Sequence, residues 1–392
     1  MSSATPRVAP SVLLILALAL GACQPAAAPA KPVASAPAPA AAGGAAGASA
    51  QGASSGGAPA ASAAPAAGGA GAPVAAGSAG AAAATAPAAP ALTPASIEVG
   101  MLPPAAFQWP TYVAEDKGYN TAQALDVQRV QIGTPNDAAR AAVSGSVALA
   151  HFSVDAAVRA IEGGGDLVVV GSEIANPAFS LIVQPEITDY AGLRGKSIGV
   201  STPKDGAAVV LRLMLRAKGL ADDDVDFASV GTTPNRYAAL KTRAADGAIM
   251  TQPLDFVALD EGFRLLGRST EVLPHFMFMS ISPNRTWARE HRDTLVRYLR
   301  GLDKAVDWLY DPANKDEAID ILARRTNTER TAAARTYGVY IEEGKIVPRH
   351  VAVPVDGLQE YLKAMIELGD LPGPTADPAR YVDLSYTQAA QQ

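Results

Sequence analysis

Cysteine is nearly missing from this chain, because Cys23 is the only one among 392 residues. A single thiol excludes an internal disulfide and any metal site built from several cysteine ligands. Histidine is scarce too, so imidazole bases are limited to four residues: His151, His275, His291 and His350. Basic residues form no stripe, and the net charge of −6 argues against a nucleic-acid partner.

Catalytic motifs are also lacking. We find no phosphate-binding lysine loop and no His-Glu-x-x-His zinc motif. The run Gly52-Ala53-Ser54-Ser55-Gly56 matches the nucleophile-elbow pattern, but no strand precedes it and no helix follows it. Three adjacent acids at 222–224 lack the spaced ligands of a calcium loop and indicate a solvated turn. The sequence therefore predicts a protein that is not an enzyme, with no cofactor and no metal site.

The N-terminus has the pattern of a bacterial secretory signal. Arg7 precedes an apolar run from Val12 to Leu20, which is too short to cross a bilayer. Two small residues then lead to Cys23, as in the box at which bacterial lipoproteins are cleaved and acylated. We therefore predict a signal peptide over 1–22 and a lipid on Cys23. The protein would be anchored outside the cytoplasm, on the periplasmic side in a diderm cell.

A low-complexity segment of Ala, Pro, Gly and Ser follows, with Lys31 as its only charge. Such a composition cannot build a core, since its prolines and glycines interrupt any helix that the alanines start. We predict that the lipidated cysteine and a disordered tether occupy 23–95. Residues 96–392, about 300 in number, are enough for one large or two modest α/β domains.

Strand-like and helical patterns alternate from residue 97 onward, which is typical of parallel βα units. Strands are predicted over 97–101, 127–132, 147–150, 167–171, 180–183, 198–201, 225–230 and 276–281. Helices are predicted from Thr134 to Gly145, from Ser153 to Gly163, and between Ser201 and Gly219. The rest is mostly helical, for example over 294–310 and 315–325.

Several short segments, taken in order and spacing, carry a resemblance to a known family. They are Ile97–Gly100, Pro110–Gly118, Leu125–Val127, Ser144–Gly145, Leu193–Lys196, Lys218–Leu220 and Asp224–Val225. Together they resemble the nitrate/sulfonate/taurine group of ABC-transporter substrate-binding proteins over nearly all of 97–392. The resemblance implies an α/β, two-lobed periplasmic binding fold of type II, with the ligand between the lobes.

In that family two extended crossovers join the lobes, and the corresponding segments here are Ser180–Pro185 and Leu273–Ser280. The resemblance implies that lobe one comprises 96–183 and 275–392, with the late helices packed on it. Lobe two would then comprise 184–274. One departure is Gln252 before Pro253, where relatives often carry an acid, and this weakens the case for a cationic ligand.

Ligands of open α/β sheets meet the loops at the carboxyl ends of strands, where helix N-termini also present free N–H groups. This rule gives the candidate ligand-binding residues: Phe107, Gln108, Trp109, His151, Phe152, Ser153, Asn176, Ser201, Thr202, Lys204, Asp205, Thr232, Thr233, Asn235, Arg236, Thr251 and Gln252. Structural roles stay open for some of them, with Phe152 in the core, Trp109 covering a helix and His151 as a satisfied, partly buried histidine.

Lys204 and Arg236 both stand near the first turn of a predicted helix, where the helix dipole disfavours cations. A shared anion would offset that cost, so we predict a solute that is anionic or electron-rich, with an aromatic or other apolar body. The alternative is that both side chains point into solvent or pair with Asp205.

The resemblance implies a transport function, in which two lobes close on a small solute and a permease recognises the closed shape. The expected partners are the solute, an ABC permease in the inner membrane and the membrane itself through the anchor, with the protein as a monomer. A ligand-sensing receptor for a membrane sensor is an alternative. Some pyrimidine synthases resemble the same fold, but their cysteine-rich motif is missing here.

Overall fold

The computed structural model describes residues 92–176, 178–373 and 376–392. The predicted signal peptide, Cys23 and the predicted tether up to residue 91 lie outside the described residues. Strand β1 already begins at Ala95, whose N–H donates to Ala124 O at 3.0 Å, so the predicted tether ends one residue too late. Among the helices that are described, none is long and apolar enough to span a bilayer.

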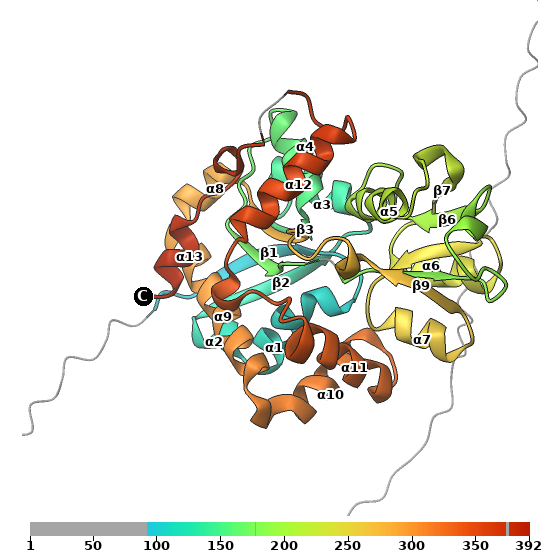
Figure 1. Ribbon diagram of the computed structural model, residues 1–392. Helices are drawn as coiled ribbons and strands as arrows, with labels where there is room; N and C mark the ends of the chain where they lie inside the picture. Colours follow the sequence, from blue (N-terminus) through green and yellow to red (C-terminus); the bar gives the residue numbers. More distant parts are fainter. Residues whose placement is uncertain (1–91, 177, 374–375) are drawn as a thin grey trace, which may run out of the picture. The chain divides into compact units, whose positions relative to one another are not determined.

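Two five-stranded sheets organise the chain (Figure 1). The first has the order β2-β1-β3-β10-β4, with β1 (Ala95–Met101), β2 (Leu125–Gln131), β3 (Leu149–Ser153), β4 (Gly171–Ile174) and β10 (Met279–Pro283). The second has the order β7-β6-β8-β5-β9, with β5 (Ser180–Val183), β6 (Ser197–Val200), β7 (Asp226–Ser229), β8 (Gly247–Met250) and β9 (Arg264–Arg268). In each sheet three strands pair in parallel, whereas β10 and β5 run antiparallel to both neighbours.

Most predicted strands are confirmed, but three expectations are wrong. Residues 167–170 form only isolated bridges, because their N–H groups bond to separate segments, and regular pairing begins at Gly171. Strands β8 and β9 are missing from the prediction. Strand β5, which the prediction assigns to lobe one, pairs with β8 and β9 of the second sheet.

Helices follow the parallel strands of both sheets. Those of the first sheet are α1 (Trp109–Asp116), α2 (Tyr119–Ala122), α3 (Pro135–Ser144) and α4 (Val154–Glu162); those of the second are α5 (Gly206–Ala217), α6 (Thr233–Lys241) and α7 (Leu254–Asp260). Both predicted ends of α3 are confirmed, since Thr134 accepts from the N–H of Asp137 at 3.2 Å and Gly145 has φ 74°. Helix α5 begins after its cap Asp205, which accepts from the N–H of Ala208 at 2.9 Å.

The C-terminal part is helical, as predicted. It comprises α8 (Arg285–Glu290), α9 (Arg292–Tyr310), α10 (Lys315–Thr326), α11 (Arg330–Tyr337), α12 (Val355–Glu367) and α13 (Ser385–Ala390). Helix α9 packs on α1, α2 and α13, beside the first sheet (Figure 1). We call the body of the first sheet with α1–α4 and α8–α13 lobe one, and the body of the second sheet with α5–α7 lobe two.

The two connections between the lobes, from β4 to β5 and from β9 to β10, touch each other. Asn176 Oδ1 accepts from the N–H of Phe276 at 3.1 Å, and Ile174 O accepts from the N–H of Phe278 at 3.3 Å. The rings of Phe179 and Phe278 meet edge to face, with centroids 4.9 Å apart. Asn176, a candidate ligand-binding residue, therefore joins the two connections to each other.

Candidate functional site

A narrow pocket lies between the lobes, lined by residues that follow β1, β3, β6, β7 and β8 at their carboxyl ends. Its volume is about 480 Å³. The apolar part of the wall is Leu102, Pro103, Ala105, Phe107, Pro135, Phe179, Ala207, Pro234, Phe278 and Met279. The polar part is Ser153, Ser201, Asp205, Thr232, Thr233, Arg236 and Thr251. We call this space the cleft pocket.

Eight of the predicted site residues line the cleft pocket, namely Phe107, Ser153, Ser201, Asp205, Thr232, Thr233, Arg236 and Thr251. Gln252 lines a neighbouring pocket, and the exposed Lys204 lines another. Thr202 and the exposed Asn235 are not part of the cleft-pocket wall. The structure thus separates Lys204 from Arg236, the two cations that the sequence analysis assigned to one anion.

Four candidates, two after β1 and two within β3, are fully buried in lobe one. Trp109 and Phe152 belong to the core, and Trp109 Nε1 donates to Ala318 O at 3.2 Å. His151 Nδ1 lies 2.6 Å from Glu173 Oε2, and its Nε2 lies 2.9 Å from the hydroxyl of Tyr298. Both ring nitrogens of His151 are therefore occupied within lobe one, away from the cleft-pocket wall.

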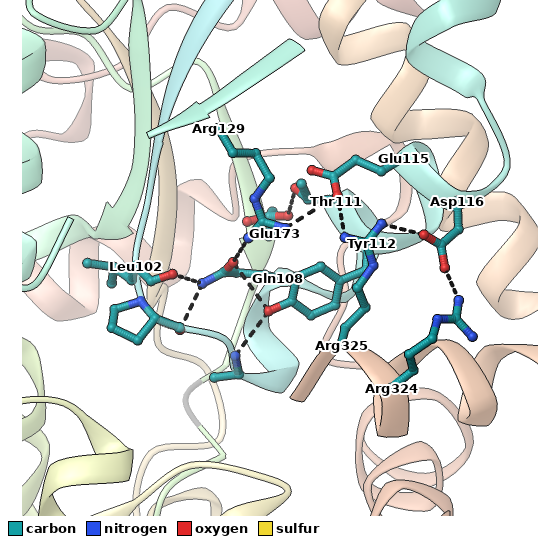
Figure 2. Close-up of polar contacts among 12 residues, drawn as sticks. Leu102, Gln108, Thr111, Tyr112, Glu115, Asp116, Arg129, Glu173, Arg324 and Arg325 are labelled. Atoms are coloured by element: carbon teal, nitrogen blue, oxygen red, sulfur yellow. Dashed lines mark hydrogen bonds and ion pairs between the residues drawn. The ribbon is translucent and has the colours of Figure 1, made fainter. Parts of the chain in front are cut away.

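Gln108, the fourth, fixes the loop that supplies Leu102, Pro103 and Ala105 to the cleft pocket. Figure 2 shows its amide between Leu102 and Arg129, with the hydroxyl of Tyr112 beside it. Its Nε2 donates to Leu102 O at 2.8 Å and to Pro103 O at 3.1 Å. Its Oε1 accepts from Tyr112 at 3.3 Å and from Arg129 at 3.1 Å. The Tyr112 hydroxyl in turn accepts from the N–H of Ala105 at 3.1 Å.

We expect Gln108→Leu to lower the free energy of unfolding by about 2–3 kcal/mol, since two buried carbonyls and two donors lose a partner. Because the freed loop forms part of the pocket wall, affinity for a bound solute should fall about fivefold. Denaturant titration and calorimetry measure the two effects. The exposed Gln128→Leu is the control and should stay within about 0.5 kcal/mol of the natural chain.

Arg236 is the cation of the cleft pocket, and most of its donors are unpaired. Its side chain is only 3% exposed, and Nη2 donates to Thr233 Oγ1 at 3.0 Å. Nε and Nη1 have no hydrogen-bond partner among the described residues. Burial lowers the pKa of Arg236 to about 10, while nearby Asp205 opposes this shift, so the guanidinium stays charged at neutral pH. A buried cation with free N–H groups is suited to an anion.

Hydroxyl groups line the same pocket as this cation. The Oγ1 atoms of Thr233 and Thr251 lie 2.9 Å apart, and the buried Ser153 Oγ has no partner among the described residues. Within the described part of the chain, no group of three or more His, Cys, Asp or Glu could hold a metal ion. The pocket therefore offers donors for an anionic group, next to an apolar wall.

Asp205 brings a carboxyl group into the same pocket. Burial raises its pKa, and nearby Asp155 raises it further, whereas Ser201, Arg236 and the N–H of Ala208 lower it. An ionised Asp205 repels a bound anion, and a protonated one does not. Anion binding should therefore favour proton uptake by Asp205.

We predict that affinity for a small sulfonate rises as the pH falls from neutral toward the raised pKa of Asp205. Asp205→Asn keeps the cap on α5 and removes the charge. It should bind the sulfonate about fivefold more tightly at pH 7.5, an effect on the order of 1 kcal/mol, and should flatten the pH profile. The free energy of unfolding should also increase as the pH falls. A carboxyl group whose pKa is higher in the folded protein than in the unfolded chain stabilises the fold at low pH, and this contribution is lost as the pH rises from the unfolded to the folded pKa.

Calorimetry between pH 5 and 8 measures this effect, and the exposed Asp223→Asn in lobe two is the matched control. Parallel profiles for Asp205→Asn and the natural chain would show that Asp205 does not couple to the anion.

Nine wall residues were not among the candidates: Leu102, Pro103, Ala105, Pro135, Phe179, Ala207, Pro234, Phe278 and Met279. Phe179 and Phe278 come from the connections between the lobes, which the resemblance located approximately. Because these connections pass between the two lobes, where the ligand is expected, their aromatic residues could have been included among the candidates.

Comparisons with known proteins agree with this geometry. A profile of the family described as NMT1/THI5 like matches residues 108–315. A curated relative, a "Putative thiamine biosynthesis protein" of Haemophilus influenzae, is 31% identical over 122 residues, which are 30% of this chain and 38% of that protein. The match thus spans well under half of the relative's length.

Solved structures show the same fold. The alkanesulfonate-binding protein SsuA of Xanthomonas axonopodis, bound to MOPS, is 18% identical with a TM-score of 0.61, covering 74% of this chain and 99% of that one. The periplasmic nitrate-binding protein NrtA of Synechocystis is 14% identical with a TM-score of 0.67, covering 76% and 88%. The predicted two-lobed periplasmic binding fold is confirmed.

Proposed function

Because the chain belongs to the NMT1/THI5-like family and has the two-lobed periplasmic binding fold, we propose that it is an extracytoplasmic solute-binding protein that delivers its ligand to an ABC importer. The observation that carries the proposal is the cleft pocket, which has the guanidinium of Arg236 in its wall, with Nε and Nη1 unpaired. Closure of two lobes on a solute gives the permease a shape to recognise.

The proposed solute is a small organic anion with an apolar or aromatic body. Arg236 and the neighbouring threonine hydroxyls would bind its anionic group. Phe107, Phe179 and Phe278 would cover its body, since all three line the same pocket. Lys204, which lines a different pocket, is not part of this site.

The proposal is tested by adding organic sulfonates, carboxylates and uncharged analogues to the purified full chain and measuring the melting temperature. A 100-fold excess of ligand over its Kd stabilises the folded state by about 2.7 kcal/mol, so a ligand gives a clear shift. Stabilisation by uncharged analogues alone would contradict the anionic class. Loss of uptake of the identified anion in a strain without this chain supports transport, whereas loss of a transcriptional response alone supports the receptor function.

We also propose that Cys23 anchors the protein to the membrane, as the N-terminal sequence predicts. Cys23→Ser should move the chain from the membrane fraction to the soluble fraction, because a serine cannot take a thioether-linked lipid. Cell fractionation and detergent partitioning measure this change. An unchanged membrane fraction for Cys23→Ser contradicts the anchor.

A non-enzymatic role is part of the proposal. The wall of the cleft pocket contains no histidine, lysine or cysteine, and its one cation and one carboxyl group come from Arg236 and Asp205. Arginine stays protonated near neutral pH, so Arg236 cannot accept a proton as a general base there.

A further inference from the structure

A second, larger space adjoins the cleft pocket, and we call it the side chamber. Its volume is about 750 Å³, compared with about 480 Å³ for the cleft pocket. The two spaces share Ala105, Thr233, Pro234 and Thr251 as wall residues. The side chamber therefore adjoins the space that contains Arg236.

Gln252 belongs to the wall of the side chamber and has a buried, unpaired acceptor. The residue is 1% exposed, and its Oε1 has no hydrogen-bond partner among the described residues. Its Nε2 donates to Asp255 Oδ2 at 2.9 Å, and that oxygen also accepts from Ser180 at 2.7 Å and Arg268 at 3.2 Å. Because the NH₂ group must face Asp255, the amide orientation is fixed, and Oε1 lacks a donor.

Arg325 lines the same chamber but is not a second anion site. It forms ion pairs with Glu115, at 3.0 Å, and with Asp116, which Figure 2 shows. Its charge is therefore neutralised within lobe one. The remaining wall has an apolar half, Pro104, Ala105, Pro234, Pro253 and Leu254, and a polar half, Thr233, Tyr237, Thr251, Thr326 and Asn327. The chamber thus fits an uncharged chain that has an apolar part and ends in a hydrogen-bond donor.

We infer that the solute is elongated, with its anionic group at Arg236 and a hydroxyl or amine at the far end that donates to Gln252 Oε1 in the side chamber. This inference rests on the proposed function and specifies its ligand. A buried acceptor without a partner destabilises the protein, and a donor on the solute removes that cost. The solute's chain would pass where the two spaces adjoin, between Ala105 of lobe one and Thr233 and Thr251 of lobe two.

Calorimetry of the full chain with three sulfonates tests the inference. Methanesulfonate probes the anion site alone, while pentane-1-sulfonate and 4-hydroxybutane-1-sulfonate have similar length and differ in their terminal group. We expect the hydroxyl-terminated sulfonate to bind about tenfold more tightly than pentane-1-sulfonate. Gln252→Leu should reduce this ratio below about twofold and leave methanesulfonate affinity unchanged, with Gln128→Leu as the control.

Gln252→Leu also removes a donor to Asp255, so a second variant keeps the test valid if that protein is unstable. Leu254→Trp fills the chamber and should weaken both long sulfonates at least fivefold, again without effect on methanesulfonate. Equal affinities for the two long sulfonates, or a preference that persists in the variants, would overturn the inference alone. Failure of all three sulfonates to bind would overturn the proposed anion site, and this inference with it.

Discussion

Replacing Arg236 with Met is expected to weaken the binding of methanesulfonate by between about tenfold and a hundredfold. Hydrogen bonds to a charged group contribute about 1.5–3 kcal/mol, and 1.4 kcal/mol corresponds to a factor of ten. Met keeps most of the bulk of the side chain. The melting temperature without ligand should be unchanged or higher, because the variant removes a buried cation whose Nε and Nη1 have no partner.

Lys204→Met is the matched control, since it removes one positive charge from an exposed side chain in a different pocket. It should bind methanesulfonate like the natural chain, and the double variant should behave like Arg236→Met. Calorimetry at constant ionic strength gives all three constants. A tenfold loss in Lys204→Met, with Arg236→Met unaffected, would move the anion site to the other pocket.

The fold could be predicted because its elements have strong local signals. Thr134, Pro135 and Gly145 mark both ends of α3, and the structure has a capped helix between them. Strand β8 could not be predicted in the same way. It is only four residues long, Gly247–Met250, and all of them are buried, so it has no alternation between apolar and polar residues.

About half of the site could be predicted, because the ends of parallel strands and the starts of helices lie next to each other in the sequence. The errors depend on contacts that are distant along the chain. His151 is occupied by Glu173 and by Tyr298, which is 147 residues away. The sequence places His151 at a strand end, but it does not show which groups complete its hydrogen bonds.

The two lobes approach each other closely at Gly206, the first residue of α5. A Cβ on Gly206 would lie 2.6 Å from Asp155 Oδ1 and 3.0 Å from the Tyr361 hydroxyl, both in lobe one. Burial leaves neither side chain space to move away from an added methyl group. Asp155 is fully buried and forms an ion pair with Arg159, and Tyr361 is fully buried in α12. Only glycine therefore allows the lobes to come this close.

We expect Gly206→Ala to weaken methanesulfonate binding at least tenfold, because the added methyl group prevents full closure and leaves the pocket open. Within lobe two the same change should not destabilise α5, since alanine favours a helix by up to about 1 kcal/mol relative to glycine. The loss should therefore occur without a fall in melting temperature, and X-ray scattering should show a larger radius of gyration with ligand present. Gly192→Ala, in lobe two, is the control, as its Cβ would make only ordinary contacts, the nearest at 3.4 Å. If Gly206→Ala binds as tightly as the natural chain, the lobes close without this contact, and the site at Arg236 does not depend on it.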